Sequence, residues 1–320
     1  MQFDWTTLGG KSPTALVKAR TLAHHAAQWL AKAARANLAA LPDDSHSSLG
    51  WDGESSALFS QPLSAGGVDV RVGLRLAGLA LILKRGDLVL DTYELAGRRD
   101  SMVGVWLDSA LRALGLKAAS GVILPYTIPS HPVARGSAYG FSGEMEAFDE
   151  LVRWFEAAAD ILEEVRGGCV DGQAGAVRCW PHHFDIATVD GFGQADGETA
   201  RSIGIGVSPG DHYYHQPYVY VSPQPHLKAA GLPPLPPPGH WHTQEFVAAV
   251  ATGEEIFTLE DRRAGVLTFV RAAYDIGRER LGAIAATPAV MAEPATSDAV
   301  AADTAVEPDK IAGDSNSNPT

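Results

Sequence analysis

Cysteine is scarce in this chain, with two in 320 residues, and long apolar runs and basic clusters are missing. Cys169 and Cys179 form no C-x-x-C pair, so the sequence predicts neither a disulfide framework nor a cysteine-based metal site. The first residues lack the basic and apolar segments of a secretory signal, and no apolar run reaches the ~18 residues that a membrane span needs. We therefore expect a soluble cytoplasmic protein with no membrane partner, in which both cysteines are small buried residues.

Positive charge is also in short supply. Lys and Arg number 25 against 38 Asp and Glu, which gives a formal net charge of −13. The segment from Ala285 to Thr320 holds six acids and one lysine, a net charge of −5, so −8 of the −13 belongs to the rest. A body this acidic repels a phosphate backbone, so we expect no nucleic-acid partner. The sequence leaves the oligomeric state open.

Two long amphipathic stretches dominate the helical pattern. Apolar residues at helical spacing predict one helix from Pro13 to Ala40, with Ser12 as its cap, and a second from Glu144 to Gly168. Between them, residues 56–95 alternate short Leu, Val and Ile runs with glycine-containing turns, which predicts three or four antiparallel strands. Asp100 is predicted to cap a shorter helix that ends at Gly115.

The order long helix, strands, shorter helix occurs twice along the chain. This predicts an α+β fold in which antiparallel sheet is covered by long helices, as one domain over residues 1–284. The repeated order suggests two related halves, 1–140 and 141–284. Residues 285–320 form an acidic tail rich in Ala and Pro, which lacks core-forming side chains and is expected to be disordered.

The last third of the ordered region contains a proline-rich connection. The run Leu232–Pro238 is predicted to be extended polyproline II, because proline has no amide hydrogen for a helix or sheet. Thr243 and Thr258 are predicted to cap the last two helices.

Histidine is concentrated in one part of the sequence. Seven of the eleven histidines lie between His182 and His242. The run Cys179–Val189 is predicted to be a strand with His183 and Asp185 on one face, and with Trp180, His182, Phe184 and Ile186 on the other. Further strands are expected at Ser202–Val207 and Pro217–Ser222. The Ser208–Asp211 segment between them predicts a turn in which Gly210 adopts a positive φ.

Three motifs in this region carry a resemblance: W-P-x-H-F-D at 180–185, G-x-S-P-G-D at 206–211 and P-Y-x-Y-V-x-P at 217–223. Together with residues 43–52 they resemble a family of uncharacterised bacterial, largely actinobacterial, proteins, over the chain to about Leu281. The resemblance implies a shared fold and pocket but no reaction. Gln224 and the Gly239–His242 run depart from the family pattern, so a site that needs His240 and His242 would not be the family's common one.

The candidate catalytic residues are His183, Asp185 and Asp211. Two residues apart on a strand, His183 and Asp185 project to one side roughly 7 Å apart, where they can share a metal ion, or where the carboxylate can orient an imidazole. With His240 and His242 they would complete a site for a divalent metal such as Zn, Mn or Fe. The competing interpretation is a buried pair that stabilises the sheet.

Several further residues are candidates for the pocket because they lie on loops or strand ends nearby: His46, His131, His182, Ser208, His212, His215 and Tyr218. Tyr213, Tyr214 and Tyr220, with Trp180 and Trp241, are expected to form core and pocket wall. The glycine-rich run 204–210 is not predicted to bind phosphate, because a strand and not a helix follows it. No G-x-S-x-G elbow supports a serine triad.

Two functions therefore stay open. One is a small-molecule pocket centred on His183 and Asp185. The sequence leaves open whether this pocket is catalytic, and a catalytic one would be hydrolase-like or metal-dependent. The other is a non-catalytic binding or structural protein in which the same motifs stabilise the sheet.

Overall fold

The computed structural model describes residues 2–65, 67–141, 143–169, 174–192 and 200–286. Contacts divide the chain into a compact unit, Met1–Ala285, and a second unit, Ala286–Thr320. Every helix and strand described below lies in the first unit, apart from the last residue of the final helix. The tail was predicted for residues 285–320, and residues 287–320 lie outside the described part of the chain.

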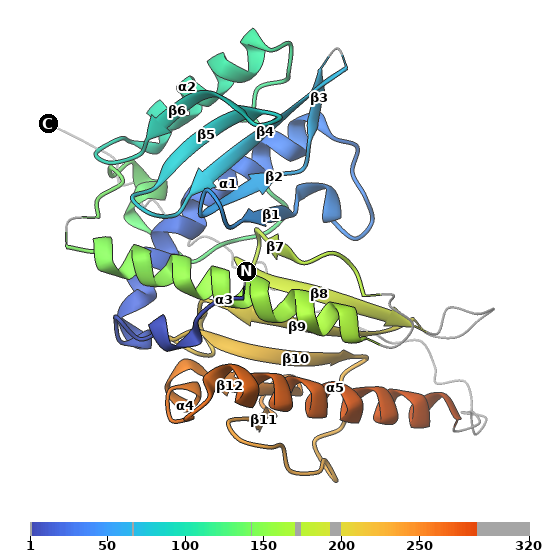
Figure 1. The fold of residues 1–320 in the computed structure, drawn as a ribbon. Helices are drawn as coiled ribbons and strands as arrows, with labels where there is room; N and C mark the ends of the chain where they lie inside the picture. Colours follow the sequence, from blue (N-terminus) through green and yellow to red (C-terminus); the bar gives the residue numbers. More distant parts are fainter. Residues whose placement is uncertain (1, 66, 142, 170–173, 193–199, 287–320) are drawn as a thin grey trace, which may run out of the picture. The chain divides into compact units, whose positions relative to one another are not determined.

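The described part of the chain builds one antiparallel sheet in the order β11-β12-β10-β9-β8-β7-β1-β2-β4-β5-β6, with β3 paired to β4 (Figure 1). The strands are β1 Leu49–Asp52, β2 Ala57–Ser60, β3 Leu63–Ala65, β4 Val68–Arg75, β5 Ala80–Arg85, β6 Leu88–Glu94, β7 Arg178–Trp180, β8 Asp185–Phe192, β9 Arg201–Ser208, β10 Tyr218–Gln224, β11 His240–His242 and β12 Ala248–Thr252. The helices are α1 Val17–Asn37, α2 Asp100–Ala113, α3 Met145–Gly168, α4 Gly253–Ile256 and α5 Arg262–Ala286.

The α+β class predicted from the sequence is confirmed. α1 precedes β1 in the chain and packs against β2, β3 and β4, whereas α3 precedes β7 and packs against β8 and β9 (Figure 1). The first strand of each segment, β1 and β7, meet in the middle of the sheet, where Leu49 pairs with Cys179. A structural relationship between the two halves stays a prediction.

Side-chain alternation gives the second half of the sheet two different faces. Ile203 of β9 is buried and packs against α5. A Cβ atom added to Gly277 of α5 would lie 3.1 Å from the Cδ1 atom of Ile203. Gly206 points the other way, and its Cα lies under the ring of Tyr220 from β10. Because residues alternate along a strand, Tyr218 and Ser222 share this second face with Tyr220. The candidate site lies on this face.

The single strand predicted for Cys179–Val189 is wrong. β7 ends at Trp180 and β8 begins at Asp185, with a tight turn between them. The amides of His183 and Phe184 both donate to the carbonyl of Trp180, at 3.2 and 2.7 Å, and Phe184 has φ +60°. Pro181 has no amide to donate to a ladder, so the pairing stops there. His182 and His183 therefore lie on a hairpin turn, and the predicted face assignment does not apply to them.

The predicted caps are also corrected by the structure. Thr243 caps no helix, because the segment that follows contains β12; instead Thr252 and Glu255 form the capping box of α4. At the start of α5 the carboxylate of Asp261, and not Thr258, accepts the amide of Ala264 at 2.9 Å.

The first part of the chain differs from the prediction in detail. Ser12 makes no side-chain cap bond, and a 3-10 turn over Pro13–Leu16 leads into α1. Residues 56–95 contain five strands where three or four were predicted. The carboxylate of Asp100 does not cap α2.

Candidate functional site

A cavity of about 350 Å³ lies on the face that carries Tyr220, over β9, β10 and β12. Six of the residues proposed from the sequence line it together, although they come from the β7–β8 turn, β8, the end of β9, the following loop and β10. These are His183, Asp185, Ser208, Asp211, His212 and Tyr218. Three tyrosines expected in the core and pocket wall also line it: Tyr213, Tyr214 and Tyr220. The remaining lining residues are Ser222, His226, Phe246, Ala248 and Val250.

Asp185 is the most unusual group in this wall. Its side chain is only 7% exposed, and the hydroxyl of Tyr220 donates to its Oδ2 atom. Its Oδ1 atom is buried and has no hydrogen-bond partner among the described residues. Burial raises the pKa of this carboxyl, and the bond from Tyr220 and the proximity of His183 offset only part of that effect. A buried carboxylate oxygen without a partner is costly, so it marks a place where a ligand group could bind.

In Asp211, by contrast, both carboxylate oxygens accept hydrogen bonds from within the protein. Its Oδ1 atom accepts the amides of Tyr213 and Tyr214, at 2.8 and 3.0 Å, which closes the loop after β9. Its Oδ2 atom accepts the hydroxyl of Tyr218 at 2.6 Å. Burial, reinforced by this carboxylate, raises the pKa of the Tyr218 phenol. Asp211 therefore shapes the cavity and contributes negative charge to it.

The turn before Asp211 has the predicted geometry at its glycine. Gly210 has φ +107°, so the predicted positive φ is confirmed, and its amide donates to the hydroxyl of Ser208 at 3.1 Å. A Cβ at this position would lie 2.9 Å from the carbonyl oxygen of Gln216 and 3.0 Å from that of Tyr214. Glycine is thus required both by the backbone conformation and by the lack of space.

A polar face of α1, not recognised in the sequence, holds both turns of the site. Arg20 donates to the carbonyls of Gly210 and Asp211, the latter at 3.2 Å. Four and eight residues further on, His24 and Gln28 lie 2.8 and 2.9 Å from the carbonyl oxygen of Pro181. The signal was present in the sequence, since these polar residues recur every fourth position in a helix otherwise rich in Ala and Leu.

Burial lowers the pKa of His24 to about 4, so its ring is neutral at physiological pH. A carbonyl oxygen can only accept a hydrogen bond, so Nε2 of the neutral ring carries the proton and donates it to Pro181. The ring also stacks on Phe184, with centroids 5.3 Å apart. The hairpin turn that presents His183 is therefore held by polar and apolar contacts from one helix.

A second cavity, of about 660 Å³, adjoins the first on the side of α1. His183, Asp211 and His212 line both cavities and form the wall between them. His182 faces only this second cavity, where burial lowers its pKa to about 4. Of the two adjacent histidines, His183 alone reaches the cavity that contains Asp185.

The four-ligand metal site suggested by the sequence is not assembled. Within the described ranges, no group of three or more His, Cys, Asp or Glu side chains lies close enough together to hold a metal ion. Three strands, β12, β10 and β9, separate His240 and His242 of β11 from Asp185 of β8, a spacing of roughly 19 Å.

His240 and His242 have a different role. The hydroxyl of Tyr214 lies 3.3 Å from Nε2 of His240 and 3.0 Å from Nδ1 of His242. The remaining ring nitrogens lie near Glu255 and the carbonyl of Gln244. The two histidines thus hold the hydroxyl of Tyr214, a residue that lines the cavity, and do not line the cavity themselves.

Three other candidate histidines lie away from the cavity. His46 is buried in a 3-10 turn, where its Nδ1 atom accepts the amide of Leu41 at 3.2 Å. His131 caps a short 3-10 helix by accepting the amide of Val133 at 3.2 Å. His215 is exposed on the loop after β9. His46 and His131 are therefore turn residues, and neither lines the cavity.

Several lining residues escaped the sequence analysis: Ser222, His226, Phe246, Ala248 and Val250. Ser222 could have been found, because it continues the alternation of Tyr218 and Tyr220 along one strand. Ala248 and Val250 lie in a segment that was assigned to a helix, since a short apolar run does not distinguish buried strand from buried helix.

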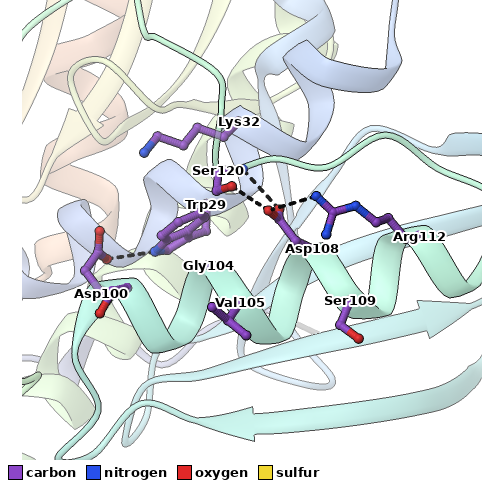
Figure 2. Close-up of a pocket in the computed structure, with 10 residues that line it drawn as sticks. Trp29, Lys32, Asp100, Gly104, Val105, Asp108, Ser109, Arg112 and Ser120 are labelled. Carbon is purple, nitrogen blue, oxygen red and sulfur yellow. Dashed lines mark hydrogen bonds and ion pairs between the residues drawn. The ribbon is translucent and has the colours of Figure 1, made fainter.

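A groove of about 650 Å³ lies elsewhere, between α1 and α2 (Figure 2). Its two carboxylates face internal partners. Asp100 accepts the indole N–H of Trp29 at 2.8 Å, and Asp108 accepts the amide of Ala119 at 2.7 Å and the hydroxyl of Ser120. The Asp108 bonds hold the loop after α2, and the Asp100 bond joins α2 to α1. Because both carboxylates have partners, the groove is a weaker candidate for ligand binding than the cavity at Asp185.

Comparison with known proteins gives no match: no family model fits the chain, and neither the curated proteins nor the solved structures include a similar one. The bacterial family resemblance therefore stays a prediction. In the described part of the chain no helix is long and apolar enough to cross a membrane.

Proposed function

We propose that the cavity bordered by β9, β10 and β12 binds a small organic molecule, with His183 and Asp185 as its polar centre. The observation that carries this proposal is the buried Oδ1 atom of Asp185, which has no partner in the described structure. Leaving a buried polar group unpaired costs about 1–3 kcal/mol, more for a charged one. A ligand that compensates this carboxylate would explain why the cost is tolerated.

The surroundings of Asp185 support the proposal. His183 is exposed at the turn between β7 and β8, yet lines the same cavity, so its imidazole can contact a bound molecule. The volume of the cavity, about 350 Å³, falls in the range of known small-molecule sites, which is about 300–1,000 Å³. An imidazole beside a carboxylate can also transfer protons, so a hydrolase-like reaction would use His183 as general base.

A second candidate, a purely structural role for these motifs, is favoured by Asp211. All its hydrogen bonds are made inside the protein, to two backbone amides and to Tyr218. If Asp185 served the same purpose, its loss would show first as lost stability.

The test is a thermal-shift screen of small molecules, together with elemental analysis of the purified protein, on the wild type and on His183→Asn and Asp185→Asn. Binding predicts compounds that stabilise the wild type, and both variants should lose that effect while keeping a native circular dichroism spectrum. The structural alternative predicts that both variants melt early and that no compound stabilises the wild type. Ligand stabilisation kept by both variants would remove His183 and Asp185 from the site.

A further inference from the structure

The described residues of the cavity wall include acids but no lysine or arginine. The acids are Asp185 and Asp211. His183, His212 and His226 are the basic side chains present. Arg20 is engaged with the carbonyls of Gly210 and Asp211 and lines the neighbouring cavity instead. A cationic ligand would meet negative charge here without competing with a cationic side chain.

Aromatic rings make up much of the rest of the wall. The rings of Tyr214 and Tyr218 have centroids 5.0 Å apart, and those of Tyr218 and Tyr220 are 6.1 Å apart. On another side of the cavity, the rings of Tyr213 and Phe246 lie 5.1 Å apart. The faces of aromatic rings carry partial negative charge and attract cations, ammonium ions in particular.

The two carboxylates strengthen this effect. The hydroxyls of Tyr218 and Tyr220 donate to Asp211 and Asp185, respectively. A phenol that donates to a carboxylate gains electron density in its ring, which makes the ring a better partner for a cation. Because both hydroxyls donate to the acids, their hydrogens are not free to donate to a ligand. The cavity thus combines an uncompensated buried acid with electron-rich rings.

Building on the small-molecule function proposed above, we infer that the ligand is an organic ammonium ion that carries an apolar group. The ammonium group lies near the tyrosine rings and donates to the unpaired Oδ1 atom of Asp185. The apolar group lies against Phe246, Ala248 and Val250, which are the apolar residues of the lining.

The experiment is calorimetric titration of the wild type with three probes that share a phenyl ring and a short chain: phenethylammonium, phenethyl alcohol and 3-phenylpropanoate. They differ chiefly in charge, which is positive, zero and negative. We expect phenethylammonium to bind at least about ten-fold more tightly than the alcohol, from cation–π contacts and the unpaired acid together. The propanoate should bind more weakly than the alcohol.

Two variants and one control locate the effect. Asp185→Asn should reduce the preference for phenethylammonium over the alcohol to within about two-fold. Phe246→Leu changes the part of the wall that contacts the phenyl ring shared by the probes, so it should weaken the ammonium and the alcohol alike. Asp87→Asn removes one acid from a fully exposed position in the β5–β6 turn and should leave the preference unchanged.

Several results would overturn the cation assignment. The alcohol or the propanoate binding as tightly as phenethylammonium would do so while leaving the small-molecule pocket in place. Binding of none of the three probes would also overturn it, and the small-molecule function would then be decided by the screen of the Asn variants. The wild-type comparison needs no variant, so it remains decisive if Asp185→Asn fails to fold.

Discussion

The hydroxyl of Tyr220 reaches Asp185 across the strand that lies between them. Tyr220 belongs to β10 and Asp185 to β8, and β9 separates the two in the sheet. The ring passes over Gly206 of β9, where a Cβ atom would lie 2.5 Å from the tyrosine ring and hydroxyl. The bond between tyrosine and carboxylate therefore depends on a missing side chain in a third strand.

Gly206→Ala should displace the Tyr220 ring and break its bond to Asp185. Losing a bond to a buried carboxyl should lower the free energy of unfolding by about 1–3 kcal/mol. Urea denaturation measures this cost. Tyr220→Phe removes the hydroxyl that makes the same bond, so it should lower the free energy of unfolding by a similar amount. Gly50→Ala in β1 is the matched control, because no atom lies within 4 Å of its added Cβ. Equal stability of the Gly206 and Gly50 variants would contradict the proposed dependence.

Asp185→Asn should alter how stability depends on pH. Burial raises the pKa of Asp185 in the folded protein, so protonation stabilises the fold. That contribution is complete below the unfolded pKa of about 3.9, and it is lost as pH rises through the folded pKa. The free energy of unfolding of the variant, relative to the wild type, should therefore increase as pH rises above about 4. Urea titrations at several pH values test this, and a constant difference would argue against a raised pKa.

Gly210→Val should destabilise the turn that precedes Asp211. A β-branched residue is strongly disfavoured at φ +107°, and its Cβ would contact backbone oxygens of Gln216 and Tyr214. We expect a cost of about 1–3 kcal/mol in urea denaturation. Gly191→Val in β8 serves as the control, since its Cβ meets no atom within 4 Å. A Gly210 variant as stable as the Gly191 variant would refute the requirement for glycine.

Arg20→Met should loosen the same turn from the other side. The guanidinium of Arg20 donates to the carbonyls of Gly210 and Asp211, and hydrogen bonds to charged groups contribute about 1.5–3 kcal/mol. Thermal and urea denaturation should show a loss of this size. Arg166→Met on α3 removes an arginine that is 41% exposed and paired with Glu163, so it should cost less than about 1 kcal/mol. Similar losses in both variants would mean that Arg20 contributes only surface charge.

Phe184→Ala should be the most destabilising of these substitutions. The ring is 1% exposed and packs between the rings of His24 and Phe155, with centroids 5.3 and 5.4 Å away. Removing a buried phenyl group typically costs about 3–5 kcal/mol, because a cavity remains. Urea denaturation measures the loss, and a cost below about 1 kcal/mol would show that the hairpin turn is not anchored by this ring.

Local pattern alone predicted much of the architecture. The periodicity of α3, and the alternation along β9 and β10, appeared in the sequence because those segments bury one continuous face. The positive φ of Gly210 followed from the Pro-Gly dipeptide, whose conformational preferences are local. The concentration of histidines identified the region where His183, Asp185 and Asp211 line one cavity.

Other features depended on contacts that no local pattern contains. The turn at Pro181–Phe184 is held by His24 and Gln28 of α1, more than 150 residues away in the chain. The histidines of β11 support Tyr214, and do not join His183, because β12 inserts between β10 and β11. The sequence alone determined which residue types were present for a site. Tertiary structure decided which of them meet, because the unpaired oxygen of Asp185 and the reach of Tyr220 over Gly206 depend on the register of three strands.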